Sequence, residues 1–216
     1  MFGRLRAVVT RLFTPIAAFL LRVGVSPDAV TIVGTLGVVG SALWLFPTGH
    51  LFAGTMAIMV FAFSDALDGV MARLSGRSGP WGAFLDSTLD RLADAAIFTG
   101  LIVWFVRTDN TWGISVGLAS LVLGSVVPYA RARAEGLGMT AAVGIAERAD
   151  RLVVTLVAAG LVGLGLPVTV LVVVLGLLAA ASAVTVVQRM ATVRRQAVAA
   201  AGAAPSEGAA ASEGGA

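Results

Sequence analysis

The sequence contains no cysteine and no lysine, and only 12% of its 216 residues are charged. The absence of cysteine excludes disulfide bonds and thiolate metal sites. Soluble domains carry about 25% charged residues, so this composition excludes an ordinary soluble domain. All 15 basic residues are arginines that flank apolar runs without forming one basic stripe, which argues against nucleic-acid binding. The pattern favours anionic membrane surfaces and phosphate-bearing ligands as partners.

Apolar residues dominate the composition of the chain. They make up 58% of the chain, and the mean hydropathy is +0.94. Runs of about 20 apolar residues with few charges are typical of membrane-spanning helices. The sequence therefore predicts an all-α integral membrane protein. The six expected spans cover residues 29–46, 51–74, 83–106, 112–134, 152–162 and 168–187.

The two ends of the chain differ from these spans. Residues 1–23 mix arginines with apolar residues, which predicts an amphipathic helix lying in the membrane interface. Residues 196–216 are mainly alanine, glycine, serine and glutamate, which predicts a disordered tail after a single membrane domain over 1–195. The connections expected on one side of the membrane carry the arginines. The positive-inside rule then places both termini in the cytoplasm, as in a multi-pass protein of the cell (inner) membrane.

Four aspartates interrupt the apolar pattern between residues 64 and 94. Asp65 and Asp68 are three residues apart and Asp86 and Asp90 four apart, so each pair lies on one face of a helix. A turn rich in glycine and serine separates the pairs, and the resulting hairpin would bring the carboxylates together near the cytoplasmic side. Four like charges in a low-dielectric setting need a cation between them, and Mg²⁺, Mn²⁺ or Ca²⁺ prefers such oxygens.

Two other interpretations of the aspartates are open. A salt bridge or a helix cap would explain one intramembrane aspartate more readily than four. A cation-coupled transporter could use the same carboxylates, although transporters usually place them near the bilayer midplane beside broken helices and internal repeats. Asp94 continues the spacing of Asp86 and Asp90, and we interpret it as supporting the site or pairing helices.

The aspartates belong to a longer pattern that resembles the signature of the CDP-alcohol phosphotransferases. Eight residues stand at its fixed spacing: Asp65, Asp68, Gly69, Ala72, Arg73, Gly82, Asp86 and Asp90. The resemblance implies six membrane helices around a polar cavity open to the cytoplasmic side, usually in a homodimer. It also implies that the four aspartates bind two metal ions, Mg²⁺ or Mn²⁺, and that Asp90 is in addition the general base.

The resemblance further implies the substrate that carries the nucleotide. A hydroxyl would attack the lipid-side phosphorus of a CDP-linked lipid such as CDP-diacylglycerol and expel CMP. The residues expected to bind this lipid are Asp28, Ala29, Val30, Thr31, Gly69, Arg73, Ser78 and Gly79.

Arginines at three separate helix ends indicate the second substrate. They are Arg131, Arg133, Arg148, Arg151 and Arg189. Guanidinium groups bind phosphate with two parallel hydrogen bonds, so the cluster favours a phosphorylated acceptor over a purely topological role. Several stretches, such as YARARAEGLG and ERADRLV, resemble the bacterial phosphatidylinositol phosphate synthases of the family, which implies inositol 1-phosphate. Glycerol 3-phosphate is the alternative acceptor. Pro128 stands where those relatives have a serine, and Ser125 is the nearest substitute.

Overall fold

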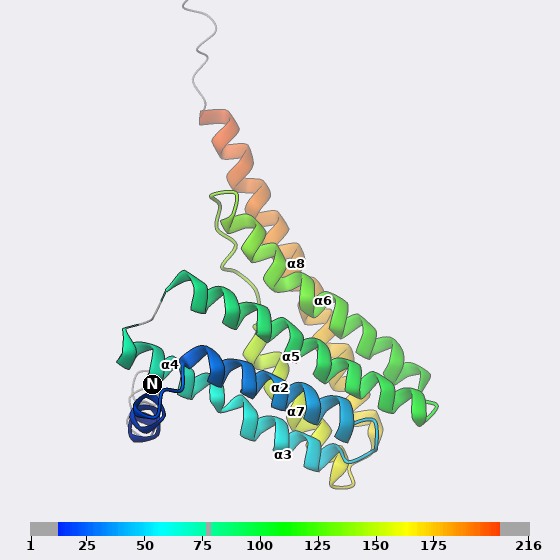
Figure 1. The fold of residues 1–216 in the computed structure, drawn as a ribbon. Coiled ribbons are helices and arrows are strands. Elements are labelled where there is room, and N and C mark those ends of the chain that lie inside the picture. The colour runs from blue at the N-terminus through cyan, green and yellow to red at the C-terminus, as the bar shows by residue number, and fades with distance from the viewer. Residues whose placement is uncertain (1–12, 77–78, 204–216) are drawn as a thin grey trace, which may run out of the picture.

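The structure, a computed structural model, describes residues 13–76 and 79–203 of the chain. Every regular element in these ranges is a helix, as predicted (Figure 1). A helical segment, Phe13–Arg22, comes first. It is followed by α2 (Pro27–Leu45), α3 (Leu51–Ala62), α4 (Ser64–Ser75), α5 (Pro80–Arg107), α6 (Thr111–Glu135), α7 (Arg148–Gly163) and α8 (Val168–Ala203).

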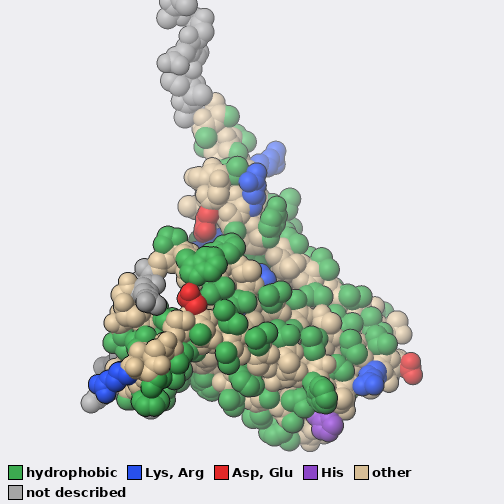
Figure 2. Space-filling view, in the orientation of Figure 1, with side chains coloured by type: hydrophobic (Ala, Val, Ile, Leu, Met, Phe, Trp, Pro, Cys, Tyr) green, Lys and Arg blue, Asp and Glu red, His purple; other side chains and the backbone are tan. Residues whose placement is uncertain are grey.

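Within residues 13–76 and 79–203, four helical segments are long and apolar enough to cross a membrane, which makes this a multi-pass membrane protein. They are Pro27–Leu45, Leu51–Ser75, Thr111–Glu135 and Val168–Gly202. The helix α5 is longer than most of these but carries Asp86, Asp90 and Arg91 in its first half, and α7 has only 16 residues. On the face that Figure 2 shows, hydrophobic side chains cover the middle of the bundle and charged ones lie mainly at its margins.

Two helix boundaries differ most from the expected ones, while α5 begins three residues and α7 four residues earlier than expected. The expected span over 51–74 is divided at Phe63 into α3 and α4, and the Ser64 hydroxyl there donates to the Phe61 carbonyl oxygen. The backbone of Phe63 stays in the right-handed helical region, so the two helices still form one apolar segment. The helix α8 continues to Ala203, past the expected end at 187 and into the expected tail, because alanine is the strongest helix former. Residues 204–216 lie outside the described part.

Close packing of α2 against α5 brings the site-forming helices together. Gly100 on α5 lies so near the Ala42 carbonyl of α2 that a side chain there would collide with the backbone. Buried residues of α2, α3, α5, α7 and α8 form the main core. A smaller cluster centred on Ala17, Val70 and Met71 packs the N-terminal segment against α4. The second cluster therefore supports the helix on which the first two aspartates lie.

Candidate functional site

The starts of α2 and α5 and the helix α4 enclose a cavity of about 320 Å³, here called the acidic cavity. Three aspartates and one arginine reach it among small residues. Its lining residues are Pro27, Asp28, Thr31, Asp68, Gly69, Ala72, Arg73, Gly79, Gly82, Ala83 and Asp86. The structure thus brings together residues that stand up to 58 positions apart, from Asp28 to Asp86, and that sequence analysis assigned to metal and CDP-lipid binding.

Asp68 is held firmly at the wall of the acidic cavity. Its side chain is buried, and the Thr31 hydroxyl of α2 donates to its Oδ2. Ser26 caps the start of α2 by accepting from the Ala29 amide, which fixes the turn that carries Asp28. The Arg73 guanidinium lies beside Gly69, because a Cβ at Gly69 would stand 3.7 Å from Arg73 Nη1, an ordinary contact distance. One wall therefore presents an acidic group and a basic group close together.

Trp81 is a contributor to this site that the sequence analysis missed. Its indole Nε1 donates to Asp28 Oδ2 over 3.1 Å and so links the start of α5 to the start of α2. The ring is 63% exposed and packs beside the ring of Phe84. An exposed tryptophan at a helix start resembles an ordinary interfacial aromatic in sequence, so only the structure reveals the contact.

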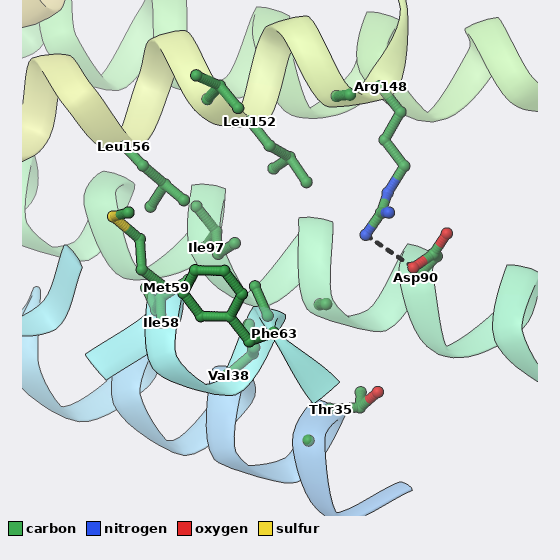
Figure 3. Close-up of a pocket in the computed structure, with 15 residues that line it drawn as sticks. Thr35, Val38, Ile58, Met59, Phe63, Asp90, Ile97, Arg148, Leu152 and Leu156 are labelled. Atoms are coloured by element: carbon green, nitrogen blue, oxygen red, sulfur yellow. Dashed lines mark ion pairs between the residues drawn. The ribbon is translucent and has the colours of Figure 1, made fainter. Parts of the chain in front are cut away.

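A second cavity of about 310 Å³, the apolar cavity, lies between α2, α3, α5 and α7. Figure 3 shows Leu152 and Leu156 of α7 facing Val38, Ile58 and Ile97 across it, with Asp90 and Arg148 at its polar end. Asp86 lines the acidic cavity and Asp90, one helical turn later, lines the apolar cavity. The two cavities therefore follow one another along one face of α5.

Asp90 forms a close ion pair with α7. Arg148 Nη2 lies 2.8 Å from Asp90 Oδ1, and Arg148 Nε donates to Asp94 Oδ1 over 3.0 Å. Arg91 Nη2 is a more distant cation, 3.8 Å from Asp90 Oδ2. Arg148, which sequence analysis assigned to the acceptor phosphate, thus bridges two carboxylates in this structure.

Arg151, one helical turn after Arg148, has a different environment. It is only 3% exposed, and its Nε and Nη1 are buried with no hydrogen-bond partner in the described part of the chain. Its guanidinium carbon lies 3.5 Å from the position that a Cβ on Gly124 of α6 would occupy. A buried cation with unsatisfied donors is costly, so this group is suited to receive an anion.

The other predicted acceptor residues make contacts within the protein. Arg189 of α8 donates to the carbonyl oxygens of Val127 and Val143, and it thereby fixes the loop before α7. Arg131 is exposed and pairs with Glu135 at 2.8 Å, and Arg133 is exposed on the same helix. Ser125, the substitute for the missing serine, donates to the Val122 carbonyl of its own helix.

Several predicted residues are not brought into these cavities by the described structure. Ala29 and Val30 line a separate apolar cavity of about 250 Å³. Ser78 and the side chain of Asp65 lie outside the described residues. Among the residues described, no three side chains of aspartate, glutamate, histidine or cysteine lie close enough together to hold a metal ion. The four-aspartate metal site therefore stays a prediction.

Comparison with known proteins decides the family. Residues 24–146, more than half of the chain, match the family described as CDP-alcohol phosphatidyltransferase. The chain belongs to this family. A phosphatidylinositol phosphate synthase of Streptomyces avermitilis is 50% identical over 194 residues, which cover 87% of this chain and 80% of the relative. The resemblance seen in the sequence is thereby confirmed.

Two solved structures of a relative agree in fold with this CDP-alcohol phosphatidyltransferase. The Mycobacterium tuberculosis phosphatidylinositol phosphate synthase with CDP-DAG bound has a TM-score of 0.80 and 44% sequence identity, covering 85% of this chain and 94% of its own. The same enzyme in complex with manganese and citrate has a TM-score of 0.79 and 43% identity, covering 84% and 88%. A divalent metal and a CDP-lipid thus occur in a close relative.

Proposed function

We propose that this protein transfers the phosphatidyl group of CDP-diacylglycerol to inositol 1-phosphate, which yields phosphatidylinositol phosphate and CMP. Family membership supports the reaction class, and the names of the relatives support the acceptor. The observation that carries the proposal is that the acidic and apolar cavities follow one another along one face of α5. A CDP-lipid has a charged nucleotide joined to hydrocarbon, and this pair of cavities matches both parts.

The acidic cavity would take the nucleotide. Arg73 lies beside Gly69 there, in a position to pair with the diphosphate, and Asp28 and Thr31 of α2 line the same cavity. The apolar cavity beside it offers a hydrocarbon surface between α3 and α7 for part of the lipid. Roles for Ala29, Val30, Ser78 and Gly79 in binding the same lipid follow from the family resemblance and remain predictions.

The donor set fits hard divalent cations. Asp68 and Asp86 supply carboxylate oxygens to one cavity, and Asp90 follows Asp86 by one helical turn. We expect these residues and Asp65 to hold two Mg²⁺ ions, or Mn²⁺ in their place. Bound cations of this kind neutralise phosphate oxygens and stabilise the departing CMP.

Asp90 is the base that we assign to the reaction. The acceptor hydroxyl oxygen bonds to the lipid-side phosphorus as the bond from that phosphorus to the bridging oxygen breaks. The bridging oxygen leaves with CMP, and the hydroxyl proton passes to the Asp90 carboxylate. Arg148 holds Oδ1 of this carboxylate at 2.8 Å, which restricts its orientation.

The acceptor phosphate would bind at the buried Arg151. Two of its nitrogens have no partner within the described chain, and a phosphate can accept from both. Arg131, Arg133, Arg148 and Arg189 belong to the same predicted set, although all but the exposed Arg133 already contact protein groups. A phosphorylated acceptor therefore suits the site better than free inositol.

We infer that α5 and α7 complete a bundle of six membrane-spanning helices with the site and both termini on the cytoplasmic side. The arginine-bearing ends of α4, α6, α7 and α8 support this orientation through the positive-inside rule. The homodimer implied by the family resemblance is also a prediction.

Release of CMP by the purified protein tests the proposal. The protein would be incubated with CDP-diacylglycerol and Mg²⁺ together with inositol 1-phosphate, glycerol 3-phosphate, free inositol or no acceptor. We expect CMP release only when inositol 1-phosphate is the acceptor, and no release when EDTA removes the metal. The Asp90→Asn variant sets the background rate.

Each other outcome has a defined meaning. Faster release with glycerol 3-phosphate would identify a phosphatidylglycerol phosphate synthase. Release without an acceptor would indicate hydrolysis. An absence of CMP under every condition would contradict the proposed transferase activity. It would then favour the alternative of a cation-coupled transporter, which family membership disfavours.

A further inference from the structure

Asp94 is a largely buried carboxylate that the family signature does not include. It lies on α5 one helical turn after Asp90, and its side chain is only 14% exposed. Its Oδ1 accepts from Arg148 Nε over 3.0 Å. A carboxylate buried this far is costly to keep ionised unless a partner compensates it, and Arg148 is that partner.

Arg148 comes from a helix that does not pack closely along α5. The helix α7 packs mainly against α3 and α8, and Arg148 at its first position reaches across to α5 (Figure 3). The Nε of its guanidinium group contacts Asp94 Oδ1, and Nη2 of the same group lies 2.8 Å from Asp90 Oδ1. A single planar group therefore sets the relative positions of two carboxylates.

The two contacts of Arg148 give Asp94 and Asp90 different roles. Guanidinium nitrogens are fixed in one plane, so a hydrogen bond at Nε determines where Nη2 points. Asp94 thus decides where Arg148 presents the nitrogen that holds Asp90. Without Asp94, the long Arg148 side chain would be free to adopt other rotamers, and the Asp90 carboxylate could rotate about its own side-chain bonds.

We propose that Asp94 is a positioning residue that acts through Arg148 to fix the orientation of the Asp90 carboxylate. The proposal rests on the proposed function, in which Asp90 is both a metal ligand and the base. Loss of groups that orient such ligands typically costs roughly 10- to 100-fold in activity or metal affinity. The same contacts would also be present if Asp94 merely tied α5 to α7, so the test must separate orientation from stability.

Two substitutions of similar shape separate these possibilities. Asp94→Leu removes the acceptor for Arg148 Nε, whereas Asp94→Asn keeps an oxygen that can accept the same hydrogen bond. We expect kcat to fall roughly 10- to 100-fold in Asp94→Leu, with much of the loss recovered in Asp94→Asn. The KM values for both substrates should stay within about twofold of wild type, because Asp94 touches neither cavity directly. Asp109→Asn, an exposed change in the loop at the far end of α5, is the matched control.

A binding measurement makes the test independent of turnover. Mn²⁺ affinity, measured from the electron paramagnetic resonance signal of the free ion, should fall in Asp94→Leu and recover in Asp94→Asn. Arg148→Lys, which cannot bridge both carboxylates, should lower kcat and Mn²⁺ affinity similarly, and Asp94→Leu should add little in that background. Failure of the wild-type protein to release CMP would end the proposed function, while the Mn²⁺ series would still decide the role of Asp94.

Two results would overturn the positioning role. One is a fall in melting temperature in Asp94→Leu with unchanged kcat per folded enzyme and unchanged Mn²⁺ affinity, which would make Asp94 a structural link. The other is a selective rise in the KM for inositol 1-phosphate, which would mean that Asp94 serves an Arg148 that binds the acceptor.

Discussion

The carboxylate region and the arginine region of this protein solve the problem of buried charge in opposite ways. In the carboxylate region, Asp68 accepts from Thr31, and Asp90 and Asp94 share Arg148. In the arginine region, formed by Arg131, Arg133, Arg151 and Arg189, the most buried member has two nitrogens without a partner in the described chain. In the first region the protein supplies a polar partner to each of these carboxylates, whereas in the second it leaves two buried Arg151 nitrogens without a hydrogen-bond partner in the described chain.

This difference indicates how the two substrates would be distinguished. Burying an unpaired charge costs several kcal/mol, so the fold must supply that energy before any acceptor binds. In the proposed function, a ligand that carries a negative charge to Arg151 would offset this cost. Specificity for a phosphorylated acceptor would then come from the unpaired buried guanidinium of Arg151. Specificity for the CDP-lipid would come from the two cavities along α5.

The largest expected effect tests the carboxylate region. Asp90→Asn removes the base, and kcat should fall by about 10²- to 10⁴-fold because a positioned base contributes about that factor. The neutral side chain keeps an oxygen for Arg148, so the fold should be retained. CMP release measured at saturating concentrations of both substrates gives kcat directly.

Binding of the nucleotide lipid provides the control for this variant. CDP-diacylglycerol should still raise the melting temperature of Asp90→Asn, since Arg73 and Asp28 remain in the acidic cavity. A wild-type rate of CMP release in this variant would remove Asp90 from the role of base, and the carboxylate region would then be a binding region only.

The sequence predicted the carboxylate region better than the arginine region for a physical reason. Its aspartates lie within 31 residues on two helices, and fixed spacing on a helix determines which side chains share a face. The contacts that balance them come from residues far along the chain. Thr31 is 37 positions from Asp68, and Arg148 is 54 positions from Asp94. Periodicity carries no information about such pairs.

The fold shows the same division between local and distant causes. Apolar runs and turn residues predicted the order of the helices and most of their ends. The break at Phe63 and the extension of α8 to Ala203 depend on contacts and propensities that hydropathy does not register. Arg189 illustrates the limit best, because its carbonyl partners, Val127 and Val143, lie in another helix and a loop.

An intermediate effect is expected for Arg151. Arg151→Met replaces an unpaired buried cation with an apolar side chain of similar length, so the melting temperature without acceptor should stay level or rise. The KM for inositol 1-phosphate should rise roughly 10- to 100-fold, since each hydrogen bond to a charged group contributes about 1.5–3 kcal/mol. Thermal unfolding without the acceptor measures the first quantity, and steady-state CMP release at varied inositol 1-phosphate concentrations measures the second.

Arg194→Met is the matched control for that substitution, because Arg194 is exposed near the end of α8 and lines neither cavity. Its melting temperature and acceptor KM should equal those of the wild type. A marked loss of stability in Arg151→Met, together with an unchanged acceptor KM, would show that Arg151 is a satisfied structural residue and that the contrast between the two regions is wrong.

The smallest effect is expected for Arg131, which is exposed and already paired with Glu135 at 2.8 Å. Exposed ion pairs contribute about 0–1 kcal/mol, so Arg131→Ala should raise the acceptor KM by no more than about fivefold. Arg131→Lys should be close to wild type, because a lysine keeps the charge that a solvent-exposed phosphate contact requires. Steady-state KM values for inositol 1-phosphate give the comparison with Arg151→Met. A rise in the acceptor KM in Arg131→Ala as large as that in Arg151→Met would mean that Arg131 leaves Glu135 and binds the acceptor. Several arginines of the region would then bind the phosphate together, instead of one buried cation.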